Sequence, residues 1–477
     1  MSPLSLALGH CLPELILAAG SVVLLFVGAI RGKEQDGLLT EFSVGVLAVA
    51  IAVILLGSKT NAVVLDGAFI DDGFGRFMKV FTLGCSLVTV AMSQDFLARE
   101  KINKFEFPIL VLLSTLGMLM LISADGLIAL YLGLELMSLA LYVLAAFHRE
   151  NIRASEAGLK YFVLGALSSG MLLYGASLLY GFAGTVSFTG IAAAIGSSAA
   201  LGVTFGLAFV MAGLAFKMSA VPFHMWSPDV YEGAPTPVTT FFATAVKLAA
   251  IAITIRVVIT VFEGIPGQWR QLVTFISILS MALGAFAAIG QANIKRLMAY
   301  SAIGHIGYAL VGLAAGGEMG VSSVLAYMAI YVVMTLGTFA GILLMRVNGQ
   351  NVENIADLSG LARTDGVMAF FLATMMFSLA GVPPLAGFFA KWYVFNAAIQ
   401  AGLYPLAVIG ILSSVVSAYY YLRIVKVMYF DEPAPAFDKP APAPRAVLAT
   451  TGLLVVFLFA YPGGFIEATR TAASSLF

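Results

Sequence analysis

The chain consists mainly of long apolar stretches separated by short polar connections. A transmembrane helix needs roughly 20 predominantly apolar residues, and stretches of about that size recur along the whole chain. The pattern predicts fourteen spans, near residues 12–30, 38–57, 74–93, 107–124, 126–147, 158–182, 200–224, 237–262, 271–290, 296–315, 321–346, 367–401, 404–429 and 446–466. Because this number is even, we expect both ends of the chain on the same side of the membrane.

Composition agrees with this pattern. Of the 477 residues, 61% are hydrophobic and 10% are charged, and the mean hydropathy is +0.99. This number of charges is too small to cover the surface of a soluble protein of this length. We therefore expect the fold class to be an all-α polytopic membrane protein. A net charge of zero argues against a nucleic-acid partner. The first 20 residues lack a basic segment and a clear cleavage site, so they lead into a retained span rather than forming a signal peptide.

Lysine and arginine residues indicate the orientation. If the N-terminus is outside, 16 of the 25 Lys and Arg residues, Arg31 and Lys33 among them, fall in inner connections. Five, including Lys79, fall in outer connections, and the remaining four lie within spans. Basic residues are retained on the cytoplasmic side of membranes. The sequence therefore predicts a multi-pass membrane protein with both termini on the outer face, which in a bacterial inner membrane is the periplasmic face.

Four ionisable residues lie deep in predicted spans: Glu135, Lys217, Lys247 and Lys391. Each would cost roughly 2.5–3.5 kcal/mol at the bilayer centre if it faced lipid. We therefore expect them inside the bundle, facing one another or a hydrated path. Two interpretations follow: a proton relay in which lysines change partners, or static ion pairs that lock helices together. The cost of deep charges favours the relay.

Two of these lysines lie next to prolines. Lys217 precedes Pro222 by five residues, and Lys391 follows Pro383 and Pro384 by eight and seven residues. Proline removes a backbone hydrogen bond and clashes with the preceding turn, so the helix should loosen at about Met218–Ser219. The stretch that contains Lys391 would be roughly 52 Å long as one helix, against about 30 Å of hydrocarbon, so it should be broken as well.

The two broken spans are the seventh and the twelfth. An odd offset of five reverses orientation in the membrane, which is typical of inverted repeats. We therefore predict two inverted five-helix repeats, 107–262 and 271–429. A three-helix segment, 1–106, precedes them, and a Pro/Ala-rich linker with the last helix, 430–477, follows.

Polar residues recur at helical spacing between the lysines. One face carries Ser301, His305 and Tyr308, and the next span carries Tyr327, Tyr331, Thr335 and Thr338. They form either a hydrogen-bonded path or interhelical contacts, and the ordinary pKa of histidine near neutrality favours a relay role for His305. Arg256 lies near a span end, where it should extend to the interface, and His224 is interpreted as structural.

Redox chemistry has no visible site in this chain. No nucleotide fingerprint, Walker sequence, haem motif or iron–sulfur cysteine set is present. Cys11 and Cys85 lie in or beside apolar segments and are interpreted as packing residues. We therefore expect no cofactor and no metal in this chain.

Four segments together resemble a known family: "AFKMSAVPFHMWSPDVYEGAPTPVT", "IKRLMAYSAIGHIGY", "LELMSLALY" and "SLAGVPPLAGFFAKW". They are similar to the antiporter-like subunits of proton-pumping NADH:quinone oxidoreductase, respiratory complex I, and most similar to the smallest of the three. The resemblance covers nearly all of the chain and points to a bacterial member. It implies fourteen helices, two inverted repeats, and other membrane-arm subunits as partners. Flavin, iron–sulfur clusters and quinone would then belong to partner subunits.

The resemblance also implies roles for five residues. Glu135 and Lys217 match the glutamate–lysine pair, and Lys247 matches the central relay lysine. His305 matches a bridging residue, and Lys391 matches the distal lysine. The implied function is proton translocation through this relay, driven by quinone reduction elsewhere in the complex. The chain would be a non-redox subunit of a translocating enzyme.

Two other functions remain open from the residues alone. A cation/proton antiporter subunit of a Mrp-like system would need the same line of ionisable groups. A structural membrane subunit would use its charges only to hold helices together. Co-isolation with flavin- and iron–sulfur-containing subunits would favour the family-based prediction over a Mrp-like antiporter. A pumping assay would distinguish the family-based prediction from a purely structural subunit.

Overall fold

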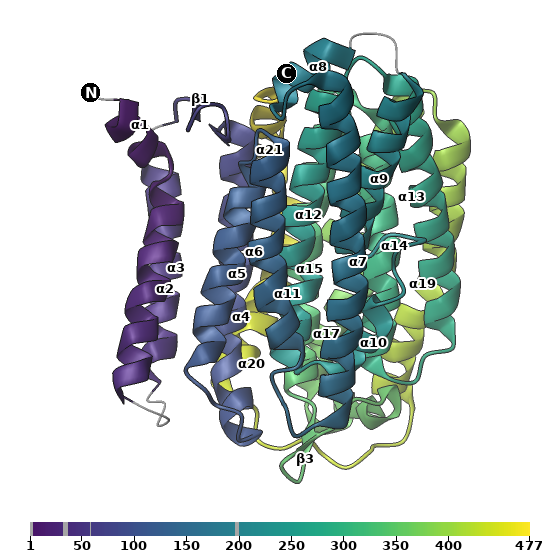
Figure 1. Ribbon diagram of the computed structural model, residues 1–477. Coiled ribbons are helices and arrows are strands. Elements are labelled where there is room, and N and C mark those ends of the chain that lie inside the picture. The colour runs from purple at the N-terminus through teal and green to yellow at the C-terminus, as the bar shows by residue number, and fades with distance from the viewer. Residues whose placement is uncertain (1–2, 32–36, 58, 196–199) are drawn as a thin grey trace.

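The computed structural model describes residues 3–31, 37–57, 59–195 and 200–477. Nearly parallel helices form one bundle, and the first and last helices, α1 and α21, both lie at the same end of it (Figure 1). This placement agrees with an even number of spans, and the side of the membrane that this end faces stays a prediction. The basic residue Lys33 lies outside the described residues.

Helices make up almost all of the described chain. The α-helices of the first half are α1 (Pro3–His10), α2 (Leu12–Arg31), α3 (Leu38–Leu56), α4 (Gly73–Arg99), α5 (Glu106–Ile122), α6 (Leu127–Ala145), α7 (Ile152–Ala183), α8 (Phe188–Ile195), α9 (Leu201–Met218), α10 (Ser227–Gly233), α11 (Thr236–Ala243) and α12 (Ala245–Arg256). Those of the second half are α13 (Pro266–Ile289), α14 (Ile294–Ala315), α15 (Gly317–Leu343), α16 (Leu361–Thr364), α17 (Gly366–Ala380), α18 (Ala386–Gln400), α19 (Tyr404–Phe430), α20 (Pro442–Ala460) and α21 (Gly463–Ser474). A π-helical segment, η1 (Val257–Val261), continues α12, and a short 3-10 helix is η2 (Ile355–Leu358).

Twelve helical segments within the described residues are long and apolar enough to cross a membrane. They are α2, α3, α4, α6, α7, α9, α11 to η1, α13, α14, α15, α19 and α20. The apolar helices α5 and α17 are shorter, with 17 and 15 residues. Every stretch predicted from the sequence thus contains a helix, and the polytopic all-α class is confirmed.

Both predicted helix breaks are present. The helix α9 ends at Met218, and Ser219 adopts a left-handed conformation with φ of 62°. The helix α17 ends at Ala380, and Gly381 has φ of 85°. At each break the residue after the left-handed one donates its backbone N–H to a carbonyl five residues earlier, Ala220 to Ala215 and Val382 to Phe377. This is the Schellman hydrogen bond, so the two half-helices end in the same way.

A third break was not predicted. Thr244, with φ of −119° and ψ of −86°, separates α11 from α12 inside the stretch 237–262. No proline lies next to it, so the composition of the stretch gives no signal. The break lies three residues before Lys247, which places that lysine in the first turn of α12.

The core of the bundle is formed by α11, α12, α14 and α15, while α2, α3 and α20 form part of its periphery. The window spanning Thr236–Val261 is 100% buried and that of α14 is 94% buried, whereas that of α20 is 28% buried. Glycine brings α13 against α14: a Cβ on Gly284 would lie 2.5 Å from the backbone nitrogen of Gly304. Small residues allow such close backbone approach in membranes. The lysines therefore lie on the most enclosed helices or beside them.

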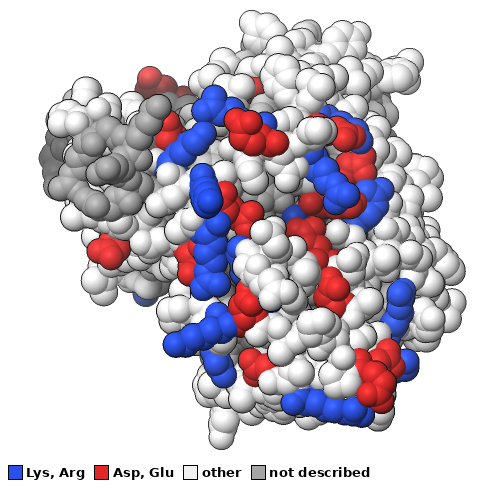
Figure 2. Space-filling view, turned by 90° about the horizontal axis from the view of Figure 1, so that it is seen from below, with Lys and Arg blue, Asp and Glu red and all other residues white. Residues whose placement is uncertain are grey.

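Two small hairpins cap the ends of the bundle. The strands β1 (Ala62–Val64) and β2 (Phe69–Asp71) pair antiparallel, and so do β3 (Arg346–Val347) and β4 (Gln350–Asn351). The hairpin of β3 and β4 lies opposite α1 and α21 (Figure 1). Figure 2 shows that end from below, with Lys, Arg, Asp and Glu side chains across its surface. We call this end the β3 end and the opposite one the terminal end.

Candidate functional site

Lys217 is the first of the three lysines predicted to lie deep in the spans. It lies in the last turn of α9, and its side chain is 1% exposed. Its Nζ donates to the hydroxyl of Tyr142 at 3.3 Å, and it lies 5.8 Å from the ring centre of Tyr161. The amino group is therefore surrounded by aromatic rings from α6 and α7 rather than by a carboxylate.

Glu135 lies on α6, seven residues before Tyr142 and on the same helical face. No ion pair within 4.0 Å joins Glu135 to Lys217, whose amino group contacts Tyr142 in this structure, so the expected pairing stays a prediction. The Oε1 atom of Glu135 is buried and has no hydrogen-bond partner among the described residues. Its helical face also carries four apolar residues more than half exposed: Ile128, Leu132, Leu139 and Val143.

Lys247 lies in the first turn of α12 and is 0% exposed. Its Nζ donates to the carbonyl oxygen of Met218 at 2.8 Å, the last residue of α9. A helix leaves its last four carbonyls without intrahelical partners, and a cation near that end is favourable. The end of α9 therefore contacts both lysines. The carbonyl of its last residue, Met218, binds Lys247, and the residue before Met218 is Lys217.

His305 lies on α14 in a cluster of hydroxyl groups. Its Nδ1 is hydrogen-bonded to the hydroxyl of Tyr327, and its Nε2 lies 3.1 Å from the hydroxyl of Tyr421. Tyr421 is also hydrogen-bonded to Ser301, and the ring of Tyr331 lies 5.1 Å from that of His305. The two faces predicted from the sequence therefore meet at His305, with α19 as a third contributor.

Lys391, on α18, repeats the arrangement of Lys247 at the second break. Its side chain is 7% exposed, and its Nζ donates to the carbonyl of Ala380 at 2.8 Å and to the hydroxyl of Ser414 at 2.7 Å. Ala380 is the last residue of α17, as Met218 is the last residue of α9. The amino group also lies 5.1 Å from the ring centre of Tyr308. Tyr308 in turn connects Lys391 to the His305 cluster, because the two rings have centroids 5.8 Å apart.

The structure joins Lys217 to Lys247 through the last turn of α9, and His305 to Lys391 through Tyr308. We call these four residues the file; Glu135 lies apart from them on α6. Within the described residues, no carboxylate lies within 4.0 Å of the amino groups of Lys217, Lys247 or Lys391. Several contributors were missed: Tyr142, Tyr421 and Ser414, together with the carbonyls of Met218 and Ala380. The helix breaks could have indicated the carbonyls, because unwound ends expose them, but no pattern identifies which lysine each one binds.

Two buried ion pairs were also missed. Arg256 does not reach the interface as expected: it is 2% exposed and donates to both carboxylate oxygens of Asp72 at 2.8 and 3.0 Å. Lys79, assigned to an outer connection, lies on α4 with its Nζ 2.7 Å from Glu14 Oε1 on α2. Both partners are distant in sequence, which is why pattern alone did not reveal them.

Near the first pair, Asp125 lies in the turn between α5 and α6. Burial raises the pKa of Asp125 to about 6; nearby Arg256 opposes the rise and Asp72 adds to it.

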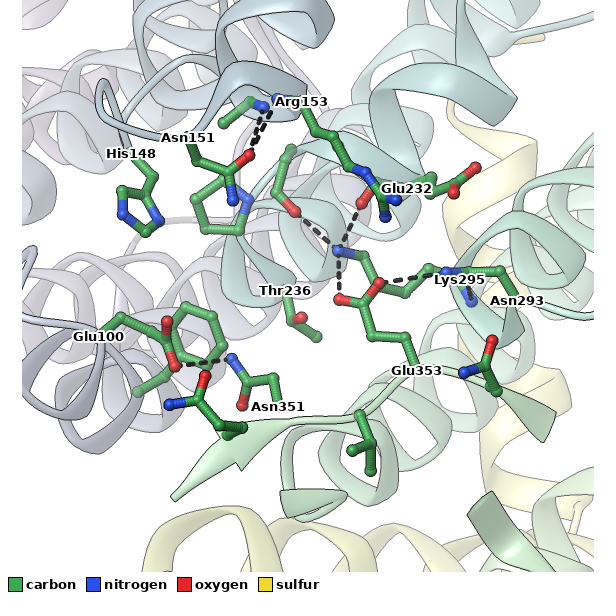
Figure 3. Close-up of a pocket in the computed structure, with 18 of the residues that line it drawn as sticks. Glu100, His148, Asn151, Arg153, Glu232, Thr236, Asn293, Lys295, Asn351 and Glu353 are labelled. Carbon is green, nitrogen blue, oxygen red and sulfur yellow. Dashed lines mark hydrogen bonds and ion pairs between the residues drawn. The ribbon is translucent and has the colours of Figure 1, made fainter. Parts of the chain in front are cut away.

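A polar cavity of about 440 Å³ opens at the β3 end (Figure 3). Lys295 projects into it and donates to the carbonyls of Glu232 and Ala234 and to the carboxylate of Glu353. Thr236, the first residue of α11, also lines it. The cavity therefore lies at the start of the segment that leads to Lys247.

Beside it, Asp229 accepts from Lys160 at 2.7 Å and from Arg296 at 2.6 Å. Burial acts to raise the pKa of Asp229, but these two cations outweigh burial and lower it below its usual value. No group of three or more His, Cys, Asp or Glu side chains in the described ranges could hold a metal ion.

A many-helix membrane bundle with a file of buried lysines is the architecture of an antiporter-like membrane subunit. Residues 124–417 match the family model described as NADH:quinone oxidoreductase/Mrp antiporter, transmembrane. The chain is 74% identical to NADH-quinone oxidoreductase subunit N of Beijerinckia indica over 100% of both chains. It is 59% identical to subunit N of Methylobacterium nodulans, over 99% of this chain and 98% of the relative. The chain therefore belongs to the NADH-quinone oxidoreductase subunit N family.

Solved structures show the same fold. A chain of respiratory complex I from Thermus thermophilus with bound aureothin is 32% identical, with a TM-score of 0.84, over 96% of this chain and 99% of that one. A chain of the Mrp complex from a Dietzia species is 23% identical, with a TM-score of 0.86, over 98% and 97%. The second likeness shows the fold alone.

Proposed function

We propose that this chain moves protons across the membrane as a subunit of the membrane arm of an NADH:quinone oxidoreductase. One observation carries the proposal: Lys217, Lys247 and Lys391, which are buried, hold no ion pair within 4.0 Å among the described residues. A lysine without a fixed counter-ion serves poorly as a static lock between helices. Its protonation can instead follow small changes in its surroundings.

Each group in the file has a distinct role in this proposal. Lys217, hydrogen-bonded to Tyr142, takes up or releases a proton as the charge on Glu135 changes. Lys247 and Lys391 hold protons at the broken ends of α9 and α17, whose carbonyls accept from them. His305 exchanges a proton through its two ring nitrogens, which lie against different tyrosine hydroxyls.

The cavity at the β3 end supplies protons to Lys247. Thr236 lines this cavity, Thr240 follows it on α11, and Thr244 lies at the break between α11 and α12. Each of these two hydroxyls donates to the backbone carbonyl four residues earlier, so polar oxygen atoms recur along the segment between the cavity and Lys247.

The position of Glu135 supports assembly with partner subunits. A half-buried carboxylate on an exposed apolar face would cost roughly 2.5–3.5 kcal/mol against lipid, so another membrane chain covers this face of α6. The energy comes from quinone reduction in other subunits, which hold the flavin, the iron–sulfur clusters and the quinone. This chain contributes no redox group and binds no cofactor.

The proposed topology completes the function. Adding the two shorter apolar helices to the twelve long ones gives fourteen spans, with the terminal end periplasmic. The repeats 107–262 and 271–429 are inverted, the segment 1–106 precedes them and 430–477 follows. The matching ends of α9 and α17, each with a lysine on its last carbonyl, support the repeat. Labelling of single cysteines placed in α1 and α21 from the periplasmic side tests the orientation.

Complex reconstituted into vesicles tests the function, with Glu135→Gln and Lys247→Ala as variants. We expect NADH-driven pumping to fall at least tenfold in each, because each variant loses one protonatable group of the proposed relay. Lys439→Ala, at an exposed lysine of the linker, is the matched control. Intact pumping in both variants contradicts the proposal. Isolation without flavin- and iron–sulfur-containing subunits would favour a Mrp-like cation/proton antiporter instead.

A further inference from the structure

Lys295 lies in the first turn of α14 and is 2% exposed, and its amino group projects into the polar cavity at the β3 end (Figure 3). Its Nζ donates to the carbonyl oxygens of Glu232 and Ala234 at 2.9 and 2.8 Å and to Glu353 Oε1 at 2.9 Å. An ammonium group has three N–H donors, so these three acceptors use all of them. The amino group is therefore fixed at the wall of the cavity.

The two carbonyls belong to the turn between α10 and α11. Residues 232–236, which we call the α10–α11 turn, all line the cavity, and the last of them, Thr236, is the first residue of α11. Pro235 lies between Ala234 and Thr236 with φ of −53°, and its ring leaves little freedom at that position. A shift of the Ala234 carbonyl is therefore passed on to Thr236.

The opposite side of this turn packs against α7. A Cβ on Gly233 would lie 2.5 Å from the carbonyl oxygen of Arg153, so the two backbones are in close contact there. The α10–α11 turn and α7 belong to the first predicted repeat, whereas Lys295 belongs to the second. The turn thus lies between α7 and the amino group of Lys295, and this lysine connects the two halves of the bundle.

The surrounding charges leave the backbone carbonyls as the main partners of Lys295. Arg296 donates to the carboxylates of Asp229 and Glu232, so the side chain of Glu232 is already paired. Glu353 is 26% exposed, and water screens its ion pair with Lys295. The other charged or titratable side chains that line the cavity are Glu100, His148, Arg153 and Asp357.

We propose that Lys295 is a positioning residue for proton entry, because it holds the α10–α11 turn, and with it Thr236, at the wall of the cavity. The inference rests on the proposed function, in which protons reach Lys247 from this cavity. Lys295 keeps its charge throughout, since a carboxylate and two carbonyls accept from it. Without this lysine the turn shifts, and the uptake of a proton becomes the slowest step of pumping.

Pumping by the reconstituted complex tests this role at different pH values on the β3 side. Lys295→Met removes all three hydrogen bonds, whereas Glu353→Gln removes the ion pair and keeps both carbonyl contacts. The double variant Lys295→Met/Glu353→Gln removes the cation without leaving a carboxylate unpaired. Gly233→Ala presses on the same turn from the side of α7 with every charge in place. Lys426→Met breaks an exposed ion pair at the same end and is the control.

We expect all five variants to pump almost normally at about pH 6.5, per assembled complex. At about pH 8.5, Lys295→Met, the double variant and Gly233→Ala should pump about tenfold less than the unmodified complex, because a limiting uptake step slows as the proton concentration falls. Glu353→Gln and Lys426→Met should follow the unmodified complex at both pH values.

A pH profile of the double variant that parallels the unmodified complex overturns the positioning role. Faster pumping at high pH overturns it as well, because Lys295 would then obstruct entry. The same steep profile in Glu353→Gln shows that the ion pair, and not the carbonyl contacts, matters. Lys247→Ala separates this inference from the proposed function: normal pumping in Lys247→Ala contradicts the function, whereas a loss there with parallel profiles in the Lys295 variants contradicts the positioning role alone.

Discussion

Buried positive charges in this protein follow two different rules. Lys79 on α4 lies 2.7 Å from the carboxylate of Glu14 on α2. Arg256, at the end of α12, lies 2.8 Å from the carboxylate of Asp72. In the central file, Lys217, Lys247 and Lys391 lie against hydroxyls and carbonyls. A fixed ion pair holds two helices in one arrangement, whereas an amino group on a neutral acceptor can lose its proton without leaving a counter-charge behind. We therefore expect the ion pairs to stabilise the helix arrangement and the lysine file to carry out the proposed proton transfer.

The largest effect should come from breaking a pair. Asp72→Ala leaves the guanidinium of Arg256 buried without its carboxylate, which typically costs about 3–5 kcal/mol. We expect the subunit to be largely absent from purified membranes, as measured by its abundance relative to the other subunits. The double variant Asp72→Leu/Arg256→Met replaces both charges by apolar groups and should restore assembly. Normal assembly of Asp72→Ala would contradict a scaffold role for the pair.

Lys79→Met and Lys391→Met form a matched test of the comparison. Both remove one buried amino group and keep the chain length. Lys79→Met leaves Glu14 without its partner, so we expect weaker assembly but normal pumping per assembled complex. Lys391→Met leaves only neutral groups, so assembly should be normal and pumping should fall at least tenfold. Proton flux measured per assembled complex separates the two, and the same phenotype in both variants would remove the distinction between the two regions.

A smaller effect is expected at the edge of the file. Tyr142→Phe removes the hydroxyl that accepts from Lys217, a hydrogen bond worth about 0.5–1.5 kcal/mol. Pumping should fall several-fold while quinone reduction continues. Tyr174→Phe, on the exposed side of α7, is the matched control. If Tyr142→Phe pumps normally, then Tyr142 is not part of the path.

The sequence indicates the buried lysines of the file more clearly than the buried ion pairs that hold the helices together, and the reason is physical. A deep lysine is visible because it breaks an apolar run, and the proline near Lys217 correctly predicted the break at Met218–Ser219. The ion pair of Arg256 joins residues 184 positions apart, and no local pattern records such a distance. The acceptors of Lys247 and Lys391 are backbone carbonyls, which every residue possesses. The pairing of Glu135 with Lys217 stays a prediction, because helical spacing fixes the face of a residue and not its distance across the bundle.

The smallest effect concerns Asp125, beside the Arg256 pair. Because burial raises its folded pKa to about 6, above the usual value of about 3.9, the folded state binds this proton more tightly than the unfolded state. Its contribution to stability is therefore fully present below about pH 4 and is lost as pH rises to about 6. Asp125→Asn removes this dependence. At pH 7 the variant should be more stable by about 1 kcal/mol or less, because water screens part of the effect.

The measurement is the thermal dissociation of the subunit from the complex between pH 4.5 and 7.5. The difference between Asp125→Asn and the unmodified protein should grow from pH 4.5 to about 6 and then stay constant. Asp95→Asn removes a carboxylate from an exposed position on α4 and serves as the control. Parallel curves for Asp125→Asn and the unmodified protein would show that this carboxyl is ionised in the folded state throughout.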